Sequence, residues 1–132
     1  MFRTIIGLFL IAHAVAHAGL AAAPIPNDPD SKPGAFFTEV SRSWLFQKLG
    51  LDGAITKKIG LILVILTVVG FILAGLGGLR IPGLNQIWST AAGLSAGVSL
   101  ILLILFWHPW LIMGVLIDFG LFLGLFLGKW PQ

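Results

Sequence analysis

Three titratable side chains, His13, His17 and Asp118, lie within long stretches of apolar residues. An ionisable group is costly inside a lipid bilayer, so a membrane helix that keeps one usually turns it toward a protein interior and uses it. Histidine changes its charge near neutral pH and is also the commonest metal ligand. Two imidazoles and one carboxylate therefore predict a buried, non-enzymatic site that binds or conducts a proton or another small cation.

The spacing of these residues indicates that they can meet. His13 and His17 are four positions apart, which places both on one face of a helix, about one turn from each other. At about 1.5 Å per residue, Asp118 reaches a similar depth if its helix starts at Pro109. The three side chains would then form one cluster if the first and last helices are neighbours. The alternative is a polar network that only fixes these helices together, in a structural or accessory subunit.

The same three residues could also bind a metal ion, whereas haem binding within one chain is not expected. Two imidazoles and a carboxylate suit a divalent metal, so His13, His17 and Asp118 are also candidate metal ligands. A metal-dependent membrane enzyme is therefore a further alternative. Haem within one chain is not expected, because its two axial imidazoles approach the iron from opposite faces, and residues four apart on one helix cannot.

His108 is the third histidine of the chain, and it follows Trp107 and precedes Trp110. Aromatic residues of this kind gather where a membrane helix meets the aqueous phase. The position predicts an interfacial belt, and it also makes His108 a candidate mouth for a polar path to the buried site.

The apolar runs predict the elements that carry these residues. Of the 132 residues, 58% are hydrophobic and only 10% are charged, whereas a soluble domain is about 25% charged. About 20 apolar residues are needed for a helix to cross a bilayer. Four segments of one domain meet this requirement: residues 5–23, 59–79, 86–107 and 109–128. Backbone groups in lipid must be satisfied within each segment, so the predicted fold is all-α, a transmembrane four-helix bundle.

The longest predicted loop comprises residues 24–58. Its first part is rich in proline and cannot be helical. Between Thr38, a candidate cap, and Gly50, a candidate stop, the pattern predicts a short amphipathic helix in the membrane interface. Asp52 is expected to cap the second membrane helix.

The net charge of +3 is spread over helix flanks and this loop, which argues against a nucleic-acid-binding patch and favours membrane-surface anchors. Arg3, Arg80 and Lys129 flank helix ends on the side of the termini. The loop on the other side carries more basic residues, which would place the loop in the cytoplasm. The first segment resembles a secretory signal peptide, although two histidines in its apolar core are atypical, and its leading Arg3 favours cytoplasmic termini. We expect a retained first helix and cytoplasmic termini.

Glycines at intervals of four residues predict seams along which helices pack closely. These glycines are Gly93 and Gly97 in the third helix and Gly120, Gly124 and Gly128 in the fourth. The seam of the fourth helix points away from Asp118, so we expect it to face the third helix or a second copy of the chain, in a homodimer or a larger membrane complex. Ser95, Ser99 and Thr67 are expected to bond to carbonyls of their own helices.

Two strings carry a resemblance to known proteins. They are GLFLIAHAVAH, from Gly7 to His17, and FWHPW, from Phe106 to Trp110, followed by Ile117 and Asp118. Both resemble segments of small uncharacterised prokaryotic integral membrane proteins with four helices, the first of which carries two histidines. The resemblance covers the whole architecture and implies a prokaryotic plasma membrane. It implies no activity, and it supports placing His13, His17 and Asp118 in one module.

Overall fold

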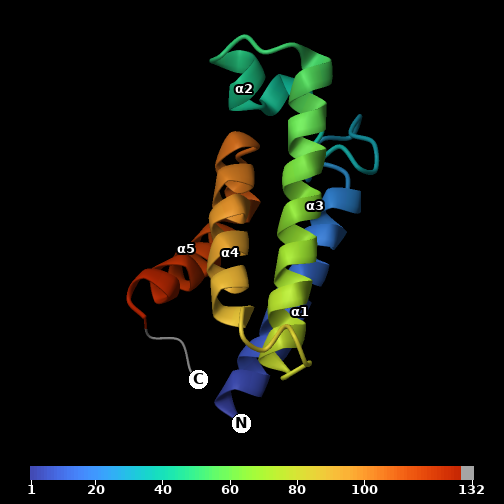
Figure 1. The fold of residues 1–132 in the computed structure, drawn as a ribbon. Helices are drawn as coiled ribbons and strands as arrows, with labels where there is room; N and C mark the ends of the chain where they lie inside the picture. Colours follow the sequence, from blue (N-terminus) through green and yellow to red (C-terminus); the bar gives the residue numbers. More distant parts are fainter. Residues whose placement is uncertain (129–132) are drawn as a thin grey trace.

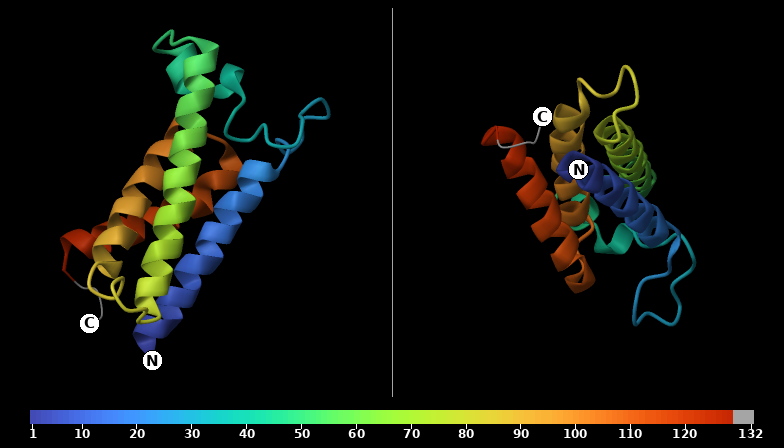
Figure 2. Two further views of the ribbon diagram at one scale, coloured as in Figure 1. Left: turned by 45° about the vertical axis from the view of Figure 1, so that its right-hand side comes forward. Right: turned by 90° about the horizontal axis from the view of Figure 1, so that it is seen from below.

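The computed structural model describes residues 1–128 of the chain. Its four main helices are α1 (Phe2–Ala22), α3 (Gly53–Gly78), α4 (Trp88–Leu105) and α5 (Ile112–Phe126). Figure 1 shows α3 and α4 side by side, with α1 behind α3 and with α5 slanting along the far side of α4. Two further views in Figure 2 show the same arrangement, with consecutive helices running in opposite directions. The fold is therefore all-α, as predicted.

Three of the helices are long and apolar enough to cross a membrane. α1, α3 and α4 have mean hydropathies of 2.0, 2.9 and 1.8 over their most apolar windows. Their outer faces carry large apolar side chains, among them Leu61, Ile65 and Leu66, each at least 51% exposed. Such a surface suits lipid rather than water. α5 has only 15 residues, which extend about 22 Å.

The observed helix ends differ from the predicted ones for local reasons. α3 begins at Gly53, before the predicted residue 59, because the carboxylate of Asp52 accepts hydrogen bonds from the backbone N–H groups of Ala54 (2.8 Å) and Ile55 (3.2 Å). These donors would otherwise lack partners at the helix start. The capping role predicted for Asp52 is confirmed. The last apolar segment begins with a 3-10 turn, Pro109–Leu111, before it continues as α5.

The loop between α1 and α3 contains two short helices instead of the one that was predicted. They are a 3-10 turn, Val40–Arg42, and α2, Trp44–Gln47. Thr38 does not cap a helix, because its hydroxyl donates to the carbonyl of Gly34 (2.7 Å). Ser43 caps α2 through its side-chain oxygen. Gly50 follows with φ +64°, a left-handed conformation that glycine adopts readily.

α1 and α3 come into close backbone contact at three glycines, Gly7, Gly75 and Gly78. A Cβ atom added at Gly7 would lie 2.8 Å from the carbonyl oxygen of Gly75, and one added at Gly78 would lie 2.8 Å from Cα of Gly7. Only glycine permits such a backbone contact, which strengthens dispersion between helices in lipid. This contact holds the histidine-bearing helix firmly against α3.

Arg3 closes the same end of the bundle. Its guanidinium donates to the carbonyl oxygens of Gly77 (2.9 Å) and Asn85 (2.8 Å), and it lies 4.9 Å from the centre of a Trp88 ring. The carbonyls at the end of α3 have no partner within that helix, so a cation there is favourable. Arg3 therefore fixes the start of α1 to the turn between α3 and α4.

The predicted glycine seams are found only in part. Gly93 is buried in α4. A Cβ atom at Gly97 would lie 3.1 Å from the ring of Phe122, so Gly97 makes room for α5. By contrast, Cβ atoms at Gly120 and Gly128 would meet nothing within 4 Å among the described residues. The seam of the fourth helix thus does not pack within the chain at these two positions, and its contact with a second copy stays a prediction. Lys129 lies outside the described residues.

Candidate functional site

Two residues of the site, His13 and His17, lie on the buried face of α1. The buried residues of this helix are Gly7, Leu10, His13, Ala14 and His17. Their intervals of three and four residues follow the helical period, so both imidazoles are carried inward with the packing face. His13 is 9% exposed and His17 is 3% exposed.

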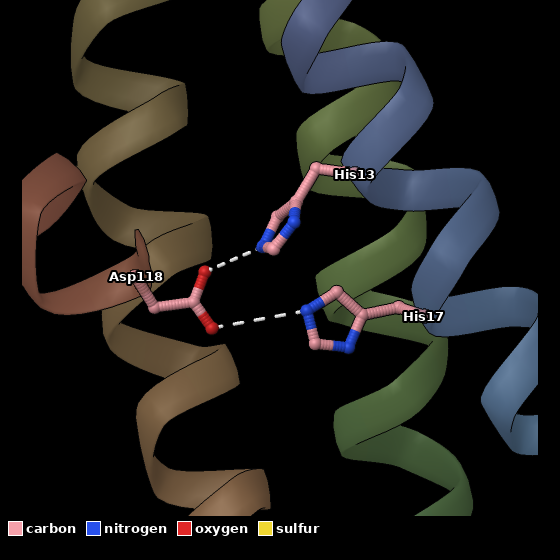
Figure 3. A group of neighbouring side chains, drawn as sticks. All are labelled: His13, His17 and Asp118. Carbon is pink, nitrogen blue, oxygen red and sulfur yellow. Dashed lines mark hydrogen bonds and ion pairs between the residues drawn. The ribbon is translucent and has the colours of Figure 1, made fainter. Parts of the chain in front are cut away.

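Asp118 approaches from α5 and is fully buried. Figure 3 shows its carboxylate facing the two imidazoles of α1, with one oxygen directed toward each. Nε2 of His13 lies 2.8 Å from Oδ1 of Asp118, and Nε2 of His17 lies 3.7 Å from Oδ2. The structure therefore brings together the three residues that their spacing and depth had associated. Among the described residues, no lysine or arginine pairs with Asp118.

Ser99 of α4 joins the cluster, and the prediction that it bonds to its own helix was wrong. Its hydroxyl donates to Oδ2 of Asp118 (2.5 Å) and lies 3.0 Å from Nε2 of His17. Ser95 does bond to its own helix, at the carbonyl of Ala91 (2.6 Å). The buried hydroxyl oxygen of Thr67 has no hydrogen-bond partner among the described residues, contrary to prediction. The site thus combines side chains from α1, α4 and α5.

The direction of each hydrogen bond follows from the number of hydrogens. A carboxylate only accepts, and the single hydrogen of the Ser99 hydroxyl is used on Asp118. Ser99 must therefore accept at its second contact, so His17 carries its hydrogen on Nε2. The same reasoning makes His13 a donor to Asp118 through Nε2. Both imidazoles therefore direct an Nε2–H toward the polar cluster.

Phe71 of α3 forms an apolar wall behind the imidazoles. Its ring centre lies 4.9 Å from that of His13, edge to face, and 6.0 Å from that of His17, nearly parallel. Phe71 is fully buried. It therefore excludes water on that side and limits rotation of both imidazoles.

A cavity of about 210 Å³ adjoins the cluster between α1 and the start of α5. Both imidazoles line it, and the remaining lining is apolar apart from the indole of Trp110. His13, His17 and Asp118 also each offer one ligand atom, and these atoms all lie within 4.8 Å of one another. The residues present therefore fit a small metal ion as well as a proton.

His108 lies away from this cluster, at the connection between α4 and α5. Its Nδ1 accepts from the backbone N–H of Trp110 (3.2 Å), which caps the turn that starts the last apolar segment. Its ring centre is 5.7 Å from that of Phe36. Burial, and then the positive charge of Arg42, lower the pKa of His108. His108 does not line the cavity beside the cluster, and its role as the mouth of a path stays a prediction.

The sequence contained a signal for Ser99 that the local interpretation missed. Ser99 precedes His108 by nine residues, and Asp118 follows Pro109 by nine. In a hairpin of two helices, equal distances from the connection mean equal depth. Depth alone thus placed Ser99 beside Asp118.

Comparison of the chain with protein-family models, curated proteins and solved structures finds no match.

Proposed function

We propose that the protein is a non-enzymatic integral membrane module that binds or conducts a proton or another small cation at His13, His17 and Asp118. The observation that supports this most strongly is the buried carboxylate of Asp118, which is bonded to His13 and Ser99 and pairs with no lysine or arginine among the described residues. A buried charge without compensation is costly in an apolar interior. One bound positive charge would neutralise the cluster.

A proton meets this requirement in the simplest way. If His13 takes up a proton, it becomes an imidazolium beside the carboxylate of Asp118, at a separation of 2.8 Å. His17 and Ser99 complete a chain of hydrogen bonds that ends on the same carboxylate. Because both imidazoles direct an N–H toward this carboxylate, His17 by way of Ser99, either one could pass a proton to Asp118. Histidine is suited to this because its charge changes near neutral pH.

A divalent metal is the second candidate, favoured by the close approach of three ligand atoms. Two imidazoles and one carboxylate bind metals such as Zn²⁺ or Fe²⁺, with coordination positions left open. Elemental analysis of gently purified protein should then give about one metal per chain. The double variant His13→Ala/His17→Ala should contain no metal. If the unaltered protein also contained none, that result would count against this candidate.

The membrane placement completes the proposal. α1, α3 and α4 each cross the bilayer, and α5 with its preceding turn forms a shorter fourth crossing. The termini then share the cytoplasmic side of a prokaryotic plasma membrane. A second copy or another subunit covers the outer face of α5. A structural role, in which the cluster only joins helices, is the alternative.

Flux measurements in proteoliposomes distinguish these functions. Asp118→Asn keeps the shape of the side chain but removes its charge, so it should abolish proton- or cation-dependent flux while the protein remains folded. Asp30→Asn, at an exposed acidic residue of the loop, serves as the matched control and should leave flux unchanged. Unchanged flux in Asp118→Asn, together with a lowered melting temperature, would favour the structural role.

A further inference from the structure

An apolar groove lies between α1 and α3 on the side of the long loop. The two helices touch at Gly7 and Gly78 and diverge toward the loop, as the left view of Figure 2 shows. The groove has a volume of about 400 Å³, and its lining includes Ala18, Ala21, Ala22, Val64, Ile65 and Val68. Ile65 is 51% exposed, so the groove opens outward. Because both helices are long and apolar enough to cross a membrane, this side faces lipid.

A polar cavity of about 520 Å³ adjoins the groove. Its charged lining includes Asp28, Lys32, Glu39 and Lys57. Gly34 also lines this cavity, and its backbone N–H donates to the carbonyl oxygen of Ala22 (3.0 Å), which lines the groove. The charged cavity and the apolar groove are therefore neighbours.

The helical period places Lys57 and the groove on one face of α3. Val64 and Val68 follow Lys57 by seven and eleven residues, so they lie within about 20° of it around the helix axis and roughly 10 and 16 Å further along. No charged residue follows Lys58 in the sequence of α3, so the ammonium of Lys57 belongs at the membrane–water boundary. Half of a hydrocarbon core of about 30 Å is about 15 Å. The cavity thus lies at headgroup level and the groove at the level of the acyl chains of the same leaflet.

The charged groups of the cavity are available to a ligand. The ion pairs among the described residues join only His13 and His17 to Asp118, so Lys32 and Lys57 are not paired there. A phosphate would complement these lysines. The carboxylates of the same wall would repel a second negative charge but would accept from an ammonium group. A headgroup that carries both charges therefore fits the cavity better than a purely anionic one.

We propose that the cavity and the groove together bind one phospholipid with a zwitterionic headgroup that ends in a primary ammonium, of the phosphatidylethanolamine type. The phosphate pairs with Lys57, the ammonium donates to Asp28 and Glu39, and an acyl chain occupies the groove. No residue lines both this site and the cavity beside the histidine cluster. The inference therefore goes beyond cation binding and needs neither histidine nor Asp118.

Native mass spectrometry of the full chain, released from neutral detergent micelles, tests this proposal. The probes are phosphatidylethanolamine, phosphatidylcholine and phosphatidylglycerol with identical acyl chains. One phosphatidylethanolamine per chain should be retained, half-saturating at a concentration about tenfold lower than either other lipid, because only its headgroup adds N–H donors to a compensated phosphate. Equal retention of the three lipids, or preferential retention of phosphatidylglycerol, would overturn the proposal. A dimer without lipid would assign this face to a second copy and overturn it as well.

Headgroup variants test the charged contacts. Lys57→Gln removes the partner of the phosphate and should weaken phosphatidylethanolamine binding about tenfold. Lys48 is also exposed and lies outside both linings, so Lys48→Gln is the matched control and should bind normally. The double variant Asp28→Asn/Glu39→Gln keeps the side-chain shapes and should abolish the preference for phosphatidylethanolamine over phosphatidylglycerol. An unchanged preference in this folded variant would contradict the proposed ammonium contact.

Groove variants test the position of the acyl chain. Ala18 is exposed and lines the groove, so Ala18→Phe should fill it and abolish saturable binding. Val15 is 63% exposed and lies outside the lining, so Val15→Phe is the matched control. Val69→Trp, which fills the groove from α3, covers the case in which Ala18→Phe fails to fold. Binding that persists in the folded lining variants refutes the site. Asp118→Asn should keep lipid binding, which separates this result from failure of the cation site.

Discussion

The imidazole of His13 and the carboxylate of Asp118 are joined by a 2.8 Å hydrogen bond, although α1 and α5 do not pack along each other. α1 is held by α3, and α5 is held by α4. The four main helices thus contact one another in the order α1, α3, α4 and α5. The polar cluster joins the first and the last of them through the interior of the bundle. A change in its charge would act on the position of α5, the shortest of the four main helices.

The contact between His13 and Asp118 should be measurable as a coupling. Each of His13→Ala and Asp118→Ala should lower the free energy of unfolding, since an interhelical hydrogen bond in a membrane protein contributes roughly 0.6–1.7 kcal/mol. The double variant should lose less than the sum of the two, because both remove the same bond. Unfolding in lipid micelles measures this difference. Additive losses would show that the two side chains act independently.

Ser99 and Ser95 offer a matched pair on one helix. Ser99→Ala removes the bridge between His17 and Asp118, so it should destabilise the protein by about 1 kcal/mol and move the ¹⁵N resonances of His17. Ser95→Ala removes only a bond within α4 and should leave both histidine resonances in place. If the two variants gave the same spectrum, the assigned bridge would be wrong.

The sequence alone predicted the helices and the three main site residues because both follow from strong physical constraints. Long apolar runs admit only helices, and the four-residue interval of His13 and His17 fixes a shared face. Ser99 was assigned locally because a serine within a helix can bond to its own backbone. Its actual partners lie on α1 and α5, and only the packing of three helices determines that choice.

The close contact of α1 with α3 was not predictable for a related reason. The chain has 17 glycines, and regular spacing drew attention to those of α4 and α5. The backbone contact is made instead by Gly7, Gly75 and Gly78. Gly7 has no second glycine four residues away in α1, so no regular spacing indicated it. The loop helix was predicted too long because its polar and apolar residues fit a helical period, while Ser43 caps a new helix within it.

Substitution at the α1–α3 contact should be costly. Gly78→Ala places a methyl group 2.8 Å from Cα of Gly7, which forces the backbones apart and should destabilise the protein by about 1–3 kcal/mol. Gly120→Ala is the control, because no described residue lies within 4 Å of its added Cβ. It should be neutral, or stabilising by at most about 1 kcal/mol. Melting temperatures of the two variants test this contrast, and similar values would refute the close contact.

The proposed homodimer depends on the free glycine face of α5. Gly120→Leu should block close approach of a second copy and shift the solubilised protein to a monomer. Gly19→Leu is the matched control, because an added Cβ at Gly19 of α1 would also meet none of the residues that the structure describes within 4 Å. Size-exclusion chromatography with light scattering gives the mass of each species. An unaltered mass for Gly120→Leu would place the interface elsewhere or leave the protein monomeric.

Stability should fall in mild acid because of His108. Burial and the charge of Arg42 lower its pKa in the folded protein, whereas the unfolded chain has the ordinary value of about 6.5. Unfolding therefore takes up a proton below that pH, so stability is complete above about pH 6.5 and decreases as the pH falls through the folded pKa. Protonation of Nδ1 would also remove the acceptor of the hydrogen bond from the backbone N–H of Trp110. His108→Asn keeps a capping acceptor without this titration. Melting temperatures between pH 7.5 and pH 5 should thus decline less in His108→Asn than in the unaltered protein, and parallel declines would exclude His108 as the titrating group.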